Sequence, residues 1–131
     1  MADKLTVVAG VIRRNSKLLL TTRPEGKPPY GLEFPGGKVD KNETLSQALK
    51  RELAEELGVD AVVFDPIYMT CTPKLDLWFI RAAIPETEEI ICREQQQYFW
   101  LDPSDEMAVR ELFDKIPLLP NDEKFWHFLC S

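Results

Sequence analysis

Three glutamates, Glu52, Glu55 and Glu56, have the residue type and spacing to do chemistry together. They lie in the segment 44–57, whose leucines and alanines recur at intervals of three and four residues. This pattern predicts an amphipathic helix, and Gly58 stands at its expected C-terminal stop. On a helical wheel of about 100° per residue, Glu52 and Glu56 fall inside the apolar arc and Glu55 at its edge. Carboxylates rarely occupy such positions without a partner.

A bound cation would explain carboxylates directed toward a core. Desolvated negative charges within one helical turn repel each other and otherwise take up protons. Mg²⁺ prefers oxygen ligands, and proteins hold it with one or two carboxylates together with substrate phosphates. The pattern therefore predicts a magnesium site, in which Arg51 orients a carboxylate through a charge-assisted hydrogen bond. A solvated face stays the alternative for any one of the glutamates on this evidence alone.

Length and charge limit the classes of function. The 131 residues fit one domain, 1–131, and the 44% hydrophobic and 29% charged residues are typical of a globular protein. A net charge of -6 disfavours binding to long nucleic acids, which need a positive field. The same charge repels a free triphosphate, so a nucleotide substrate requires bound cations.

The N-terminal segment carries no targeting signal that we can identify. Its apolar run, residues 5–12, is too brief for a signal peptide or a membrane span. We therefore expect a cytoplasmic protein without a membrane partner. The cysteines are Cys71, Cys92 and Cys130, an odd number without metal-ligand spacing, and we expect reduced thiols.

The elements around the predicted helix indicate an α/β fold. Runs of β-branched, apolar and aromatic residues between turn-prone segments predict strands at 7–12, 17–22, 31–34, 61–72, 75–83 and 98–101. Further helices are expected at 102–115 and 122–130. Residues 23–30 form a proline-rich loop. With no repeat or linker, this order predicts an α/β/α sandwich around a mixed central sheet.

The segment 37–59 resembles the Nudix box. Its invariant positions are matched by Gly37, then Glu43 after five residues, then, after seven more, Arg51, Glu52, Leu53, Glu55, Glu56, Gly58 and Val59. The resemblance implies the Nudix fold, with the box as a loop-helix-loop. It also implies that Glu52, Glu55 and Glu56 bind Mg²⁺, with Mn²⁺ as a possible substitute. The Gly37 carbonyl would join these ligands, while Arg51 and Glu43 hold the box together.

More of the chain resembles the MutT-like nucleoside triphosphate pyrophosphohydrolases of this family. The similarity lies in residues 32–38, which include Phe34 and Lys38, in the first two strands, and in Trp100 and Asn121. It implies hydrolysis of a nucleoside triphosphate to a monophosphate and pyrophosphate, with water attacking the β-phosphorus. Either Glu52 or Glu94 would act as general base.

The resemblance assigns further residues to the substrate. Arg23 would contact phosphate and Glu94 would lie over the metals; an ordinary loop position is the alternative for both. Asn121 would read an oxidised guanine through its amide, which offers a donor and an acceptor together. Asp122 follows directly, and an aspartate near this place is common in relatives that prefer cytidine nucleotides.

Two aromatic residues are candidate surfaces for stacking a base, namely Phe34 and Trp78, and core packing is the alternative for both. From this resemblance we expect 8-oxo-dGTP to be the substrate. The role of the enzyme would then be to sanitise the nucleotide pool. CTP or a modified dCTP is the first alternative. ADP-ribose is a weaker one, suggested by Pro73 fifteen residues after Gly58, and a non-catalytic nucleotide-sensing domain is the last. We expect a monomer or a weak dimer that binds a small-molecule nucleotide.

Overall fold

Strand β1 (Leu5–Arg14) is the centre of the sheet in the computed structural model, which describes residues 4–24, 26–94 and 96–131. It runs parallel to β6 (Leu75–Ala83) along most of its length. It is antiparallel to β2 (Lys17–Thr22) near its C-terminal end and to β4 (Gly36–Lys38) near its N-terminal end. Strand β1 therefore joins two groups of strands into one mixed sheet.

The remaining strands extend the sheet on both sides. Strand β2 pairs with β3 (Leu32–Glu33) and with β7 (Tyr98–Leu101), and both pairings are antiparallel. Strand β5 (Val62–Cys71) pairs antiparallel with β6 and forms the opposite edge.

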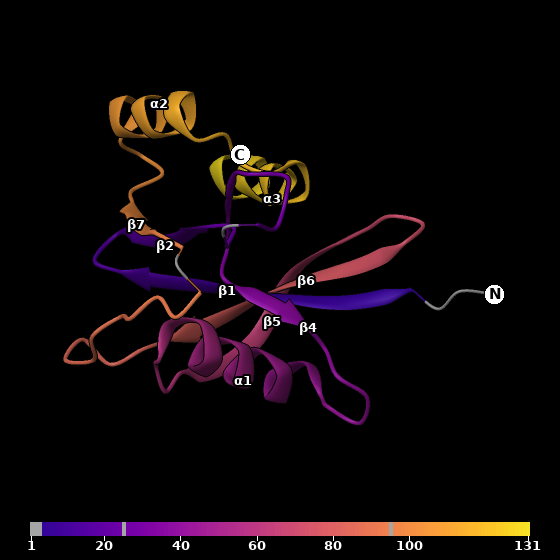
Figure 1. Cartoon of the computed structure of the whole chain (residues 1–131). Coiled ribbons are helices and arrows are strands. Elements are labelled where there is room, and N and C mark those ends of the chain that lie inside the picture. The colour runs from indigo at the N-terminus through magenta and orange to yellow at the C-terminus, as the bar shows by residue number, and fades with distance from the viewer. Residues whose placement is uncertain (1–3, 25, 95) are drawn as a thin grey trace.

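Helices cover both faces of the sheet. Figure 1 shows α1 (Leu45–Leu57) below the sheet and α2 (Glu106–Lys115) and α3 (Pro120–Cys130) above it. The predicted α/β class, and the mixed sheet between layers of helices, are thus confirmed. Within the described ranges, no helix is long and apolar enough to cross a membrane.

Two separate hydrophobic clusters hold these layers together, because successive strand residues point to opposite faces. In β2, Leu19 packs in the cluster beneath the sheet with Leu49 and Leu53 of α1. Its neighbours Leu18 and Leu20 belong to the cluster above the sheet. That upper cluster contains an aromatic group in which the rings of Phe79 and Phe125 stack with centroids 4.3 Å apart, joining β6 to α3. A strand with apolar residues on consecutive positions is what a sheet covered on both faces requires.

Helix α1 begins and ends where the residue types predict. Thr44 caps the N-terminus in a capping box with Gln47, in which each side chain accepts from the other residue's backbone N–H. Gly58 ends the helix with a left-handed φ of 66°, which glycine adopts without strain. The orientation of the three glutamates is therefore set by an element with both ends fixed.

Several bounds differ from those expected, most of them by one or two residues, and the differences at α2, α3 and β4 have clear causes. Helix α2 is capped by Asp105 and starts at Glu106, because Asp102 instead forms a turn with Ser104. Helix α3 starts at Pro120, two residues early, since proline is favoured in the first helical turn. Strand β4 was not expected, because its two glycines lack strand propensity; it is held by pairing with β1.

Replacement of Phe125 by alanine tests the upper cluster. Phe125 is fully buried, so Phe125→Ala should lower the free energy of unfolding by about 3–5 kcal/mol. Urea unfolding at equilibrium measures this change. Met107→Ala, at a residue that is 74% exposed, is the control and should shift the free energy by less than about 0.5 kcal/mol. A Phe125→Ala variant as stable as the control would contradict the packing described.

Candidate active site

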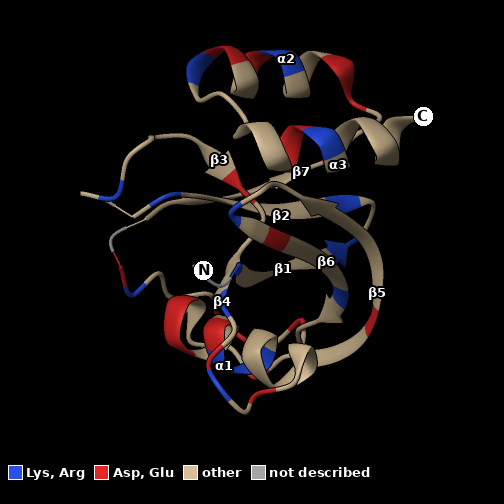
Figure 2. Cartoon of the chain, turned by 90° about the vertical axis from the view of Figure 1, so that its right-hand side faces the viewer, with Lys and Arg blue, Asp and Glu red and all other residues tan. Residues whose placement is uncertain are grey.

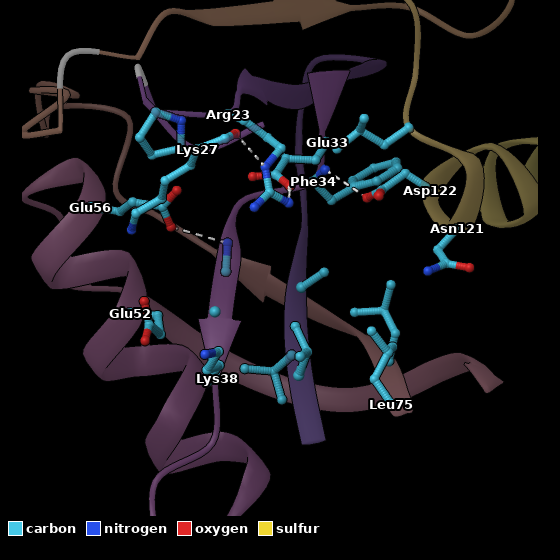
Figure 3. A pocket seen from close by; sticks show the side chains of 18 of the residues that line it. Arg23, Lys27, Glu33, Phe34, Lys38, Glu52, Glu56, Leu75, Asn121 and Asp122 are labelled. Carbon is cyan, nitrogen blue, oxygen red and sulfur yellow. Dashed lines mark hydrogen bonds and ion pairs between the residues drawn. The ribbon is translucent and has the colours of Figure 1, made fainter. Parts of the chain in front are cut away.

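A cavity of about 720 Å³ lies between α1, β4, the segment after β2 and the start of α3. Figure 3 shows Glu52 and Glu56 on one side of it and Asn121 and Asp122 on the other. Among the residues lining this cavity are those predicted from the Nudix and MutT-like patterns: Arg23, Phe34, Gly37, Lys38, Glu52, Glu55, Glu56, Glu94 and Asn121. The fold therefore brings together segments that are far apart in the sequence.

The carboxylate of Glu56 is buried, with 4% of the residue exposed. Its Oε2 accepts a hydrogen bond from the Gly36 N–H at 3.1 Å, and its Oε1 accepts from the Gln96 amide at 3.2 Å. Burial, together with the charges of Glu33, Glu94 and Glu52, raises the pKa of Glu56 to about 8. This group is therefore positioned by neutral donors, the Gly36 N–H and the Gln96 amide.

Arg51 organises the remaining carboxylates of α1. Its Nε donates to Glu43 at 2.7 Å, and its other nitrogens donate to the Lys38 carbonyl at 2.9 Å, to Glu52 at 3.0 Å and to Glu55 at 3.2 Å. The planar guanidinium serves several acceptors at once, which an ammonium could not do in the same geometry. Burial raises the pKa of Glu52, and the bond from Arg51 opposes that rise.

Two glycines allow β4 to lie between β1 and α1. A Cβ on Gly37 would collide with the Glu52 carboxylate, and a Cβ on Gly36 would collide with the Val8 carbonyl. Glycine is needed at these positions because of close approach, and the close approach lets the Gly36 N–H reach Glu56.

The donor set fits a hard divalent cation in its chemistry. The inward-facing groups are carboxylate oxygens, and their mutual repulsion together with burial raises the pKa of Glu52 and Glu56, a cost that a bound cation would relieve. In the described part of the chain, no three acidic, histidine or cysteine side chains are grouped closely enough to hold an ion.

Basic residues line the cavity beside the carboxylates. The guanidinium of Arg23 lies 3.6 Å from Glu33 and donates to the Lys27 carbonyl at 3.2 Å. Lys27 and Lys38 are exposed and also line the cavity. Burial raises the pKa of Glu33 to about 7, although Arg23 and Lys27 lower it. Sequence reasoning did not identify Lys27, because the course of a proline- and glycine-rich loop has no periodicity. Figure 2 marks the acidic positions of α1 in red.

The opposite end of the cavity is formed by the start of α3. Asn121 is half-buried and lines the cavity, whereas Asp122 is 6% exposed and its Oδ1 accepts from the Phe34 N–H at 3.0 Å. Burial raises the pKa of Asp122 to about 7, opposed mainly by that hydrogen bond. Asp122 thus connects α3 to the segment after β3, a role that its sequence position did not reveal.

The structure corrects one aromatic assignment and qualifies the other. Trp78 packs in the lower cluster with α1 and does not line the cavity, because alternation along β6 directs Leu77 toward the cavity and Trp78 to the other face. Phe34 does line the cavity, but its ring is 3% exposed and stands edge-on to Phe79, with centroids 5.7 Å apart. Core packing therefore accounts for Trp78 fully and for most of the Phe34 ring.

The segment after β6 brings Glu94 to the cavity. The Ile91 and Arg93 N–H groups donate to the Leu57 and Glu56 carbonyls at the C-terminal end of α1, at 2.9 and 3.0 Å. Glu94 follows these anchors, and its charge raises the pKa of Glu52 and Glu56, as expected for a nearby carboxylate.

Residues 4–122 match the NUDIX domain. The chain belongs to the Nudix hydrolase family. Among its relatives, the 8-oxo-dGTP diphosphatase of Haemophilus influenzae is 39% identical over 103 residues, which cover 75% of this chain and 76% of that protein. The CTP pyrophosphohydrolase of Escherichia coli is 52% identical over 60 residues, covering 45% of this Nudix hydrolase and 44% of the relative.

A solved structure agrees with this family assignment. The solution structure of the Escherichia coli ORF135 protein is similar, with a TM-score of 0.72 and 32% identity, over 98% of this Nudix hydrolase and 90% of that chain. Family membership and the named diphosphatase and pyrophosphohydrolase relatives make the chain an enzyme of this class.

Conservative replacement of Arg51 tests its place in the site. Arg51→Lys keeps the charge but loses the fork that reaches Glu43, Glu52 and Glu55 together. We expect kcat/KM for hydrolysis of a nucleoside triphosphate to fall by about 10- to 100-fold. Arg110→Lys, at an exposed arginine of α2, is the matched control. Retention of activity within a factor of two would contradict the organising role.

The burial of Asp122 predicts a pH dependence of stability. Its pKa is about 7 in the folded protein against an ordinary value of 3.8, so the folded state binds more protons between these values. Its contribution is therefore full below its ordinary pKa and is lost as the pH rises through about 7. Asp122→Asn removes this dependence, so the stability of the variant relative to the wild type should increase by roughly 1 kcal/mol per pH unit in that window.

Urea unfolding at about pH 5 and about pH 8 measures the difference between the two proteins. Asp114→Asn, at an exposed residue of α2, provides the control. A stability difference between Asp122→Asn and wild type that is constant or decreases with pH would refute the prediction.

Proposed function

We propose that this Nudix hydrolase converts 8-oxo-dGTP to the nucleoside monophosphate and pyrophosphate, with Mg²⁺ as cofactor. The observation that carries the proposal is the single cavity that joins the glutamates of the Nudix box to Asn121. The 39% identity to an 8-oxo-dGTP diphosphatase over three quarters of both chains supports it.

The residues proposed to hold Mg²⁺, or Mn²⁺ in its place, are Glu52, Glu55, Glu56 and the Gly37 carbonyl, with Glu94 from the segment after β6. When bound, the cation supplies charge neutralisation on the phosphates and lowers the pKa of the attacking water. This compensates for the net charge of -6, which otherwise repels the substrate.

Side chains of the protein are proposed to bind the phosphates and to accept the proton of the attacking water. Arg23, Lys27 and Lys38 line the cavity and are proposed to bind phosphate oxygens by charge-assisted hydrogen bonds. Glu52 and Glu94 are the candidates for the base that accepts a proton as water attacks the β-phosphorus. No covalent intermediate is required, because phosphoryl transfer depends on positioning and charge stabilisation.

The base of the nucleotide is proposed to bind at the end formed by α3. The Asn121 amide presents a donor and an acceptor, which match the keto and ring N–H edge of a guanine. Val7, Leu75 and Leu77 line the same cavity and supply apolar surface for the faces of the base. These aliphatic walls replace the aromatic surface that the sequence suggested at Trp78.

A cytidine nucleotide is the second candidate substrate. The observation that favours it is the 52% identity to a CTP pyrophosphohydrolase over 60 residues. Asp122, however, directs its Oδ1 to the Phe34 backbone, so Asn121 is the more available of the two side chains. Pro73, the feature that suggested ADP-ribose, is exposed and does not line the cavity.

We further propose that residues 1–131 act as a single domain, as a cytoplasmic monomer or weak dimer that removes an oxidised nucleotide from the precursor pool and so avoids mutation. The substrate in this proposal is a small molecule, and neither a long nucleic acid nor a membrane takes part.

Pyrophosphate release from a panel of substrates tests the function. With Mg²⁺, the wild type should prefer 8-oxo-dGTP over dGTP, CTP, 5-methyl-dCTP and ADP-ribose, and a chelator should abolish release. Asn121→Ala should lower kcat/KM for 8-oxo-dGTP by about 10- to 100-fold, the effect of losing a paired base contact. Glu55→Gln serves as the inactive control.

The panel also separates the alternatives. A preference for CTP or 5-methyl-dCTP would refute the guanine assignment and retain the hydrolase mechanism. Nucleotide binding without turnover of any substrate would refute the catalytic proposal.

A further inference from the structure

We propose that Gln96 is a positioning residue, which sets the orientation of Glu56 and holds Glu94 at the same end of the cavity. This inference rests on the proposed function, since it concerns the residues proposed to bind the cation. Gln96 is 6% exposed and lies in a polar run, residues 92–97, that gave no sequence signal of burial. A glutamine is seldom buried without satisfied partners.

Both polar atoms of the Gln96 side-chain amide form hydrogen bonds. Its Nε2 donates to Glu56 Oε1 at 3.2 Å, and its Oε1 accepts from the Glu94 N–H at 3.1 Å. A carboxamide offers a donor and an acceptor on one planar group, which neither a carboxylate nor an ammonium does. Gln96 therefore links a side chain of α1 to the backbone at Glu94.

The bond to Glu56 completes the placement of that carboxylate. Its other oxygen accepts from the Gly36 N–H at 3.1 Å, so one donor from β4 and one from Gln96 determine the plane of the group. Each carboxylate oxygen retains a second lone pair for another partner. Glu56 is thus oriented from both sides by neutral donors.

The hydrogen bond from the Glu94 N–H to Gln96 lies between two residues, Arg93 and Gln97, whose backbones are hydrogen-bonded to other parts of the chain. Before it, the Arg93 N–H donates to the Glu56 carbonyl at 3.0 Å. After it, the Gln97 N–H donates to Thr22 Oγ1 at 2.9 Å, and the Gln97 carbonyl accepts from the Thr22 N–H at 2.9 Å. The Gln96 side chain is the contact that ties the backbone at Glu94 to the carboxylate of Glu56.

A positioning role differs from general stabilisation in what it changes. If Gln96 only fills space, its replacement lowers stability and leaves the geometry of Glu94 and the affinity for a cation as they are. If it positions both groups, its loss frees the Glu94 amide and weakens cation binding, because ligand orientation by neighbouring hydrogen bonds is worth about 10- to 100-fold in metal affinity or activity.

The experiment compares Gln96→Ala and Gln96→Met with Gln97→Ala in the full chain. Gln96→Met keeps most of the volume and removes both hydrogen bonds, so it separates packing from bonding. Gln97 is exposed, and its hydrogen bonds named above come from the backbone, which makes it a matched control.

Three quantities are measured for each variant. Amide hydrogen exchange is followed by NMR in the metal-free protein. In both Gln96 variants, the backbone amide of Glu94 should exchange faster than in the wild type, and the backbone amide of Gln97 should exchange at the wild-type rate. The Kd for Mn²⁺, measured by electron paramagnetic resonance, should rise by about 10-fold or more. In steady-state hydrolysis of 8-oxo-dGTP, kcat should fall by a similar factor, with a smaller change in KM.

The proposal is overturned if exchange at Glu94 keeps its wild-type rate in Gln96→Met, or if the Kd for Mn²⁺ stays within twofold of wild type. Failure of the proposed function would look different, because the wild type would then hydrolyse none of the nucleotides. Exchange and Mn²⁺ binding still decide the role of Gln96 in that event.

Discussion

The carboxylate of Glu56 lies in the interior, and its surroundings are arranged to accommodate it. Burial and the charges of three nearby glutamates together raise the pKa of this group to about 8. Two neutral donors hold it in place. One of these donors belongs to β4. This strand can lie close to β1 because Gly36 has no side chain to collide with the Val8 carbonyl. Strand β4, with its Gly36 N–H, and the segment after β6, with the Gln96 amide, both contact this one acid.

The negative charges of the more exposed acids are compensated by ion pairs with Arg51. It gathers Glu43, Glu52 and Glu55 around one guanidinium, at distances of 2.7 to 3.2 Å. The result is a site with ion-paired carboxylates at its edge and, at its centre, a buried carboxyl whose pKa is raised and whose hydrogen bonds come from neutral donors. Such a distribution suits the binding of a cation at the centre, where the relief of repulsion is greatest.

Much of this arrangement could be predicted from the sequence, because the relevant signals are local. The 3.6-residue periodicity located α1 and the unusual placement of its glutamates, and Gly58 marked its end. The strands β1 and β2 followed from β-branched and apolar runs on either side of turn-prone residues. The family pattern then named nine of the residues that line the cavity, among them the glutamates of α1.

The remaining features depend on contacts between distant segments. Strand β4 exists through its pairing with β1. Burial of Gln96 and Asp122 depends on partners 40 and 88 residues away. The direction of Trp78 depended on the register of β6, and a change of one residue exchanges the two faces of a strand. Composition and spacing do not contain this information.

The stacking of Phe79 against Phe125 bears on how enzymes of this kind diverge. These two rings lie in the core and do not line the cavity, and their stacking joins α3 to β6. Side chains at the mouth of the cavity can therefore be exchanged one at a time while the helix that carries them keeps its place. A duplicated gene could thus acquire a new substrate in small steps, each leaving a folded protein for selection to act on.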